Sequence, residues 1–314
     1  MKIALLFSGQ YRSVPPEIFQ NSLSTLVEGI DYSIYSYCWE EKGNSMNHSI
    51  SVPVVKKTNI SNDIETIFKP FNLKDYSFES FSKFKKNLPA KYKRILNSKR
   101  FHFGTIHSLP QIYSIFKCYE LFKSDLNNEE YDLIFRCRYD SVFIHPLILF
   151  PLKSILNSDN LYNINFGRAY YPQRVYDIFF GGSKKSMSFI SSIWDDLPNL
   201  IDNSFDNNLD KRDACRILFL APNLKNIKVK TFNSRICDVF RNANDYGFEK
   251  YIIYSHIINI FKIRNLSVLK YFSDHLISRK ISIVKIIFYI LITLFLTPFS
   301  YIKRIKYIFN CKNF

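Results

Sequence analysis

Two arginines and an aspartate stand at alternate positions near the middle of the chain. Arg136, Arg138 and Asp140 follow the apolar run Leu133–Phe135 without any turn signal, and such a run is typical of a buried strand. Alternate side chains of an extended chain share a face, so these three charged groups are expected to point the same way. Two guanidinium groups suit a diphosphate, and a carboxylate suits a divalent cation, a ribose or a sugar hydroxyl.

This charged stretch has two interpretations. The carboxyl end of a strand in an open α/β sheet is where ligands bind, and a nucleotide-sugar would engage all three charged groups. The alternative is an internal network of ion pairs without a ligand, because buried ion pairs also occur where they serve no function. The stretch by itself leaves both open.

A second group of candidates follows the first apolar run of the chain. Ser8, Gly9, Gln10 and Arg12 come directly after Ile3–Phe7. A glycine at the end of an N-terminal strand allows a ligand to approach the backbone closely, so these residues are candidates for surrounding a nucleotide. The plainer interpretation is an ordinary turn between a strand and a helix.

Three single residues complete the set. Asp177 precedes an apolar segment that ends in a glycine pair, where a carboxylate could act as a general base toward an acceptor hydroxyl or simply occupy a turn. Lys117, on the more polar side of a predicted helix, is a further candidate for contacting the nucleotide. His145 is a weaker candidate metal ligand because of its proximity to Asp140 in the sequence.

The elements that would position these residues alternate between strand and helix. We expect strands at Lys2–Phe7 and Asp31–Trp39, a helix opened by Pro15-Pro16, and a helix over Ser108–Ser124 with Ser108 as its cap and Pro110 in its first turn. A helix, a short turn and a buried strand form the second half of a βαβ crossover. Neither G-x-G-x-x-G nor a Walker A sequence occurs, which argues against a dinucleotide fingerprint and an ordinary P-loop kinase.

The composition indicates a packed protein. The chain has 314 residues, of which 47% are hydrophobic and 17% aromatic, so disorder is not expected. Its six cysteines are scattered without a C-x-x-C pair, which favours neither a zinc knuckle nor a disulfide framework and fits a reducing, cytoplasmic setting. No cleavage-like site follows the first apolar run, so no signal peptide is expected.

The positive charge is concentrated at the C-terminal end. The formal net charge is +16, and residues 250–314 contain eleven lysines or arginines and a single acid, Asp274. The segment Ile281–Ile302 is almost wholly apolar, but its uninterrupted core is shorter than the roughly 20 residues that span a bilayer. We expect a helical tail that lies in or dips into the inner leaflet and contacts anionic lipids, although a true span or a helix that forms oligomers stays open.

A basic stretch interleaved with aromatic residues lies between positions 75 and 104. Its lysines and arginines run from Lys83 to Arg100. The sequence leaves open whether this stretch is a solvated insertion or a lid over an anionic substrate.

Several of these segments, in this order, resemble one enzyme family. The opening Ile3–Arg12, the helix around Gln111–Leu121, the segment Ile134–Asp140, and Asp177 before Phe-Phe-Gly-Gly-Ser are similar to bacterial glycosyltransferases from O-antigen and capsule gene clusters with a GT-A-like fold. The resemblance covers roughly residues 1–241. Each motif is short, and the resemblance rests on their order and spacing.

The resemblance implies an α/β fold, a Rossmann-type mixed sheet flanked by helices, in a catalytic domain over residues 1–249, followed by the membrane-associating tail 250–314. It implies a nucleotide-diphosphate sugar donor and a lipid-linked glycan acceptor at the inner membrane. It also places Arg138-Tyr139-Asp140 at the D-x-D motif of the family, with Arg138 in place of the first acid. A divalent cation, manganese or magnesium on Asp140, is therefore in doubt, and Arg136 and Arg138 are alternative partners for the leaving diphosphate.

Rival functions stay open. One is a transferase of a phosphate-containing group at the same membrane. Another is a non-catalytic, membrane-bound scaffold of the same fold, which the missing acid favours. A nucleic-acid-binding function is disfavoured because no groove-reading motif occurs and the charge lies beside an apolar segment. The donor sugar, the linkage, the oligomeric state and the choice between inversion and retention, on which the need for Asp177 as a base depends, are not determined by the sequence.

Overall fold

The computed structural model describes most of the N-terminal three quarters of the chain. The described residues are 1–11, 16–42, 56–57, 60–97, 104–125, 130–143, 146–164, 175, 177–203, 227–232 and 237–239. The chain divides into two units, 1–239 and 240–314, and all described residues belong to the first. The predicted tail and the boundary at 249/250 lie outside the described residues. None of the helices in the described ranges is long and apolar enough to cross a membrane.

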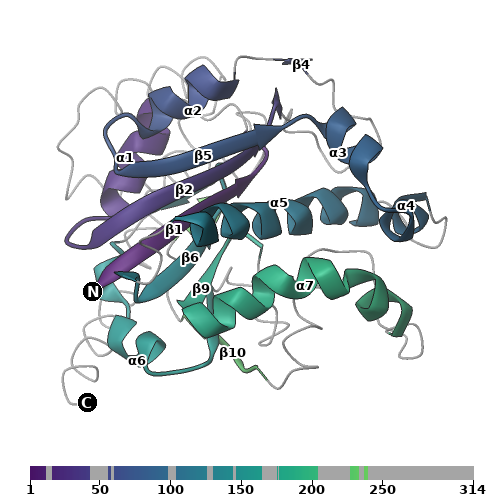
Figure 1. Cartoon of the computed structure of the whole chain (residues 1–314). Helices are drawn as coiled ribbons and strands as arrows, with labels where there is room; N and C mark the ends of the chain where they lie inside the picture. Colours follow the sequence, from purple (N-terminus) through teal and green to yellow (C-terminus); the bar gives the residue numbers. More distant parts are fainter. Residues whose placement is uncertain are drawn as a thin grey trace, which may run out of the picture. The chain divides into compact units, whose positions relative to one another are not determined.

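A mixed seven-stranded sheet forms the centre of the fold (Figure 1), which confirms the predicted α/β class with helices flanking the sheet. The strand order is β10-β8-β9-β6-β1-β2-β5. The strands of this sheet are β1 Lys2–Gly9, β2 Asp31–Trp39, β5 Leu73–Glu79, β6 Leu133–Cys137, β8 Leu161–Ile164, β9 Phe179–Ser183 and β10 Val229–Phe232. Two short pairs lie apart from it: β3 Glu41–Lys42 with β4 Lys56–Lys57, and β7 Ser141–Phe143 with β11 Cys237–Val239.

Strand direction decides which residues meet at the edges of the sheet. β1 runs parallel to both β2 and β6, β2 is parallel to β5, and β8 is parallel to β10. β9 runs antiparallel to its neighbours β6 and β8. The residues that follow β1 and β6 therefore lie at the same edge as the residues that precede β9. This edge holds Ser8, Gly9, Arg138, Asp140 and Asp177, which are among the predicted site residues.

Helices cover both faces of the sheet (Figure 1). On one face lie α1 Pro16–Leu26 and α2 Ile60–Phe68, where the rings of Phe19 and Phe68 pack on Phe7 of β1 at centroid distances of 5.6 and 5.1 Å. On the other lie α5 Gly104–Ser124 and α7 Lys184–Asn203. A short 3₁₀ helix, η2 Leu147–Leu149, and α6 Leu152–Leu156 precede β8. The central strands are apolar on both sides because both faces are covered.

The face under α5 and α7 carries the largest apolar core. Ala4, Leu6 and Ile134 of the sheet pack there with Ile112 and Ile115 of α5, together with apolar residues of α7. Alternation along β1 and β6 then places Ser8 and Arg136 on this same face, one step beyond the apolar core. The polar site is thus a continuation of the core toward the edge of the sheet.

Two sequence-based expectations for α5 are wrong. The helix begins at Gly104, one turn before the predicted start, so Ser108 is not its cap and Pro110 lies inside it. A proline nitrogen carries no hydrogen for the helical bond, and this is tolerated more readily near the start of a helix than in its middle. Helical periodicity in the sequence predicts one apolar face made of Ile112, Ile115, Phe116, Tyr119 and Phe122. All of these are buried except Phe116, which is partly buried.

The basic stretch between positions 75 and 104 is neither a solvated insertion nor a lid over its described length. Its first residues belong to β5, the edge strand of the sheet, and it continues as α3 Phe81–Asn87 and α4 Ala90–Asn97. Phe84 and Tyr92 are buried in the core with α5 and α7, while Lys83 and Lys93 are exposed. The two helices are amphipathic, because their aromatic residues pack into the core and their lysines face solvent. The many lysines concealed this pattern in the sequence.

The glycine pair in β9 is required by packing. A Cβ on Gly181 would lie 2.3 Å from Cδ1 of Phe135 and 2.4 Å from the carbonyl oxygen of Ile134. A Cβ on Gly182 would lie 2.3 Å from Oγ of Ser186 and 2.8 Å from the carbonyl oxygen of Asn160. Gly181 thus lets β9 lie close against β6, and Gly182 leaves room for Ser186 of α7 and for the backbone before β8.

We expect Gly181→Ala to destabilise the protein by about 2 kcal/mol or more, because the added methyl group overlaps backbone as well as a ring and the strands must separate. Chemical denaturation of the purified protein measures this. Lys185→Ala is the matched control nearby, since its ion pair with Asp159 is exposed and contributes little. Equal stability of the two variants would contradict the packing role of the glycine.

Candidate functional site

The antiparallel pairing of β9 with β6 builds the candidate site. Cys137 pairs with Phe179 at the end of the ladder, and beyond it the backbone N–H of Arg138 donates to the carbonyl oxygen of Ile178 at 3.2 Å. Asp177 is therefore carried to the residues that follow β6, at the carboxyl ends of β1 and β6. This is the edge where open α/β sheets bind ligands.

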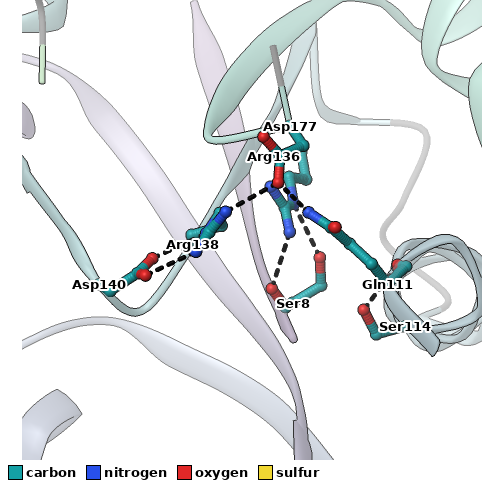
Figure 2. Close-up of polar contacts among 7 residues, drawn as sticks. All are labelled: Ser8, Gln111, Ser114, Arg136, Arg138, Asp140 and Asp177. Atoms are coloured by element: carbon teal, nitrogen blue, oxygen red, sulfur yellow. Dashed lines mark hydrogen bonds and ion pairs between the residues drawn. The ribbon is translucent and has the colours of Figure 1, made fainter. Parts of the chain in front are cut away.

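Arg136 is a buried cation with unused hydrogen-bonding capacity. The residue is 1% exposed, its Nε donates to Oγ of Ser8 at 3.0 Å, and its Nη2 donates to the carbonyl oxygen of Ser8 at 3.0 Å (Figure 2). Its guanidinium carbon lies 6.0 Å from the ring centre of Phe180, and its buried Nη1 has no hydrogen-bond partner. A buried donor without a partner costs free energy, so this atom is expected to serve a ligand.

Burial lowers the pKa of Arg136 to about 10, and the negative charge of Asp177 partly offsets this effect. The side chain therefore stays charged at neutral pH. Its positive charge has no carboxylate as a hydrogen-bond partner within the described ranges.

Gly9 lies close to Arg136 and has no side chain that would stand between them. Its φ of +119° lies in the region that side chains rarely adopt, and a Cβ there would lie 3.8 Å from Nη2 of Arg136 and 4.0 Å from Oγ of Ser114. Ser114 comes from α5, where its hydroxyl donates to the carbonyl oxygen of Gln111 at 2.8 Å. Ser8 and Gly9, two of the candidates for surrounding a nucleotide, thus lie beside Arg136.

Arg138 links two carboxylates. Its Nε donates to Oδ1 of Asp140 at 2.7 Å, its Nη2 donates to Oδ2 of Asp140 at 2.6 Å, and its Nη1 donates to Oδ2 of Asp177 at 2.7 Å (Figure 2). The side chains of Arg138, Asp140 and Asp177 are 13%, 2% and 13% exposed. Burial works against the charge of Arg138, but the two carboxylates outweigh it and raise its pKa above the ordinary value.

Gln111 completes this arrangement from α5. Its side-chain amide donates to the same oxygen of Asp177 that accepts from Arg138. The carboxylate is therefore positioned from two directions, by the loop after β6 and by the helix. The general-base role of Asp177 stays a prediction.

The expectation that three charged side chains would share one face holds only in part. Arg138 and Asp140 pair with each other, whereas Arg136 turns to Ser8. Tyr139 points to the opposite face, where its hydroxyl lies 2.7 Å from Oγ of Ser36 and its ring packs on Phe7. The sequence left ligand binding and an internal ion-pair network as alternatives. The structure shows Arg138 in an ion-pair network and Nη1 of Arg136 without a hydrogen-bond partner, and ligand binding stays a prediction.

The donor set does not fit a resident divalent cation. Both oxygens of Asp140, the predicted metal ligand, accept hydrogen bonds from Arg138. Within the described residues, no group of three or more histidine, cysteine, aspartate or glutamate side chains could hold a metal ion. His145 lies outside the described residues.

The other predicted residues are placed as follows. Gln10 turns away from the arginines, since its amide donates to the carbonyl oxygen of Glu41 at 3.3 Å. Lys117 is partly buried on α5, and no hydrogen bond or ion pair within the described ranges joins it to the residues of Figure 2. Arg12 lies outside the described residues.

Two features of this edge were missed. The sequence gives no separate role to Gln111, because nothing in it indicates that this residue lies close to Asp177. Glu79, at the end of β5, accepts hydrogen bonds from the hydroxyls of Tyr37 at 2.8 Å and Tyr113 at 3.0 Å. Its position at the end of a strand was the available signal, and the basic residues that follow concealed that strand.

Comparisons with known proteins give likeness only to solved structures. No protein-family model and no curated protein matches the chain. One similar structure is apo mouse xyloside xylosyltransferase 1, with 10% identity, a TM-score of 0.44, and coverage of 74% of this chain and 85% of that chain. Another is a proposed nucleotide-diphospho-sugar transferase from Desulfovibrio desulfuricans G20, with 10% identity, a TM-score of 0.38, and coverage of 90% and 99%. The function of this chain is therefore inferred from its own residues.

The two arginines should differ sharply in their effect on stability. Arg138→Met removes three short charged hydrogen bonds to two little-exposed carboxylates and is expected to cost about 3–5 kcal/mol. Arg136→Met removes two hydrogen bonds but also a buried charge without a partner carboxylate, so a cost of about 1–2 kcal/mol is expected. Denaturant unfolding without ligand measures both. Similar losses for the two variants would show that Arg136 also serves chiefly to hold the fold together.

Proposed function

We propose that this protein is a glycosyltransferase that binds a nucleotide-diphosphate sugar at the carboxyl edge of β1 and β6. The observation that carries the proposal is the buried, charged Arg136, whose Nη1 lacks a partner and whose Nη2 lies near Gly9. A diphosphate supplies both the negative charge and the acceptor oxygens that this group lacks. The order of motifs that resembles GT-A-like transferases supports the same donor.

In this proposal the residues of the chain bind and orient the donor. Nη1 of Arg136 donates to a phosphate oxygen and stabilises the charge that grows on the leaving diphosphate. Ser8 holds the guanidinium in place from the end of β1, and Gly9 lets the diphosphate approach the backbone. The bond from the anomeric carbon to the phosphate oxygen breaks, and its electron pair leaves with the nucleoside diphosphate. The bond to the acceptor oxygen forms as the acceptor hydroxyl loses its proton.

Asp177 is the candidate for receiving that proton if the reaction inverts the anomeric centre. Its fixed position between Arg138 and Gln111 supports a role in orienting an acceptor hydroxyl, because a carboxylate held on two sides keeps its direction. Asp140, buried against Arg138, supports the loop after β6 and is further from solvent than Asp177.

The proposed acceptor is a lipid-linked surface glycan, as in O-antigen or capsule synthesis, and the proposed location is the cytoplasmic face of the inner membrane. The composition of residues 250–314 supports this, because an apolar segment flanked by lysine and arginine binds anionic lipid surfaces. Such a tail would bring the catalytic unit to an acceptor that cannot leave the membrane.

A non-catalytic scaffold of the same fold is the second candidate, and one observation favours it. Arg138 forms ion pairs with Asp140 and Asp177 without a ligand, as expected for a protein of this fold that has lost its catalytic activity. The two functions differ in what the chain needs in order to act. A scaffold keeps its effect in the cell when Arg136 is replaced, whereas a transferase loses it.

Nucleotide binding tests the proposal directly. Titration calorimetry with a panel of nucleoside diphosphates should identify one base that binds, and Arg136→Met should weaken that binding by about 10- to 100-fold through loss of a charged hydrogen bond. Lys153→Met is the matched control, since this exposed lysine on α6 lies outside the site. No binding of any nucleotide to the wild-type protein, or equal binding by Arg136→Met, would refute the proposed donor site.

A further inference from the structure

We infer that Arg138 takes the place of a divalent cation in this protein, so that its donor site works without metal. The inference rests on the proposed function for the identity of the donor, but its structural part concerns only Arg138, Asp140 and Asp177. Two carboxylates at a ligand-binding edge are an ordinary beginning of a metal site. Here a guanidinium that belongs to the chain is already bound between them.

The geometry shows how completely this cation occupies the carboxylates. Three nitrogens of Arg138 donate to three carboxylate oxygens at 2.6–2.7 Å, and Gln111 adds a donor to Oδ2 of Asp177 (Figure 2). These are the short distances of charge-assisted hydrogen bonds. A metal ion needs the same oxygens, so it would have to displace the guanidinium.

Displacing Arg138 is unfavourable because the site is buried. Its side chain is 13% exposed, and without Asp140 and Asp177 its charge would lack a partner in a poorly solvated place. A divalent cation that bound without displacing it would meet two neighbouring guanidinium groups. Repulsion between these like charges in a poorly solvated place works against such binding.

The arrangement also has a consequence for Arg136. Asp177 is the carboxylate with the strongest electrostatic effect on Arg136, yet its Oδ2 accepts from Arg138 and Gln111. Arg138 binds Oδ2 of Asp177, and the buried Nη1 of Arg136 is left without a hydrogen-bond partner. Arg138 is thus a positioning residue, acting on the donor through the carboxylates that it binds.

The first test measures metal dependence on the wild-type protein. Binding of the nucleoside diphosphate should change by no more than about twofold between excess chelator and millimolar manganese, and manganese alone should not bind at Asp140. Manganese binding is followed by electron paramagnetic resonance, and any signal that persists in Asp140→Asn belongs elsewhere on the protein. A strengthening of about tenfold or more by manganese, or a signal that Asp140→Asn removes, would overturn the inference.

The second test creates the metal site that Arg138 replaces. Arg138→Ala releases both carboxylates, so manganese should bind to this variant and raise its melting temperature, because a ligand that binds the folded state stabilises it. The wild type and Arg138→Ala/Asp140→Asn should show no such rise. If manganese does not stabilise Arg138→Ala, or Arg138→Ala is too unstable to purify even with manganese, the carboxylates do not form a latent metal site and the inference fails.

The outcomes for the two proposals are separable. If no nucleotide binds with or without manganese, the proposed transferase function fails, while the manganese measurements without nucleotide still decide the role of Arg138. If nucleotide binds only with manganese, the transferase function stands and the inference about Arg138 is wrong.

Discussion

The buried ion pairs of Arg138 with Asp140 and Asp177 are the constraint on which this edge of the protein depends. Charges so little exposed are tolerated only when each finds a partner, and here each partner comes from a different side of the site. Asp140 lies two residues further along the same loop, while Asp177 precedes β9. The ion pairs thus fasten the end of β6 to the beginning of β9 beyond their last backbone pair.

Two features of the sheet make this arrangement possible. β9 runs against the direction of β6, which places its first residue at the edge where the other strands end. Gly181 and Gly182 allow β9 to approach without steric overlap. Helix α5, which packs on one face of the sheet, supplies Gln111 and Ser114 to the same edge. Backbone packing, rather than any local motif, therefore sets the distances among the polar groups.

Arg136 and Arg138 are two residues apart in the chain but have different hydrogen-bond partners. Arg136 lies within β6 and faces the end of β1, where a serine hydroxyl and carbonyl accept two of its hydrogen bonds. Arg138 lies beyond the strand and meets two carboxylates. The charge of Arg138 is thus compensated inside the protein, whereas the charge of Arg136 is the one that we propose to serve a ligand. This division links the stability of the edge to the proposed binding of a diphosphate.

The sequence alone predicted the central elements and singled out one charged edge. Unbroken apolar runs predicted β1 and β6, a run rich in tyrosine and isoleucine predicted β2, and helical periodicity predicted a buried face of α5. Charges directly after a buried strand predicted where a ligand would bind. These features are local, because apolar spacing reports burial within a single element. The basic stretch that contains β5, α3 and α4 was misjudged because its charged residues are more numerous than the aromatic ones that pack.

Only the tertiary structure decided which charged groups meet. The antiparallel pairing of β9 with β6 brings together residues that are distant in sequence. The same holds for the hydrogen bonds that Asp177 accepts from Arg138 and Gln111. The sequence also gives no sign that Nη1 of Arg136 lacks a partner. Strand order and direction arise from the packing of whole layers, which no short segment encodes. Residue types can therefore show that a site holds two cations and two carboxylates, whereas folding determines which cation remains for a ligand.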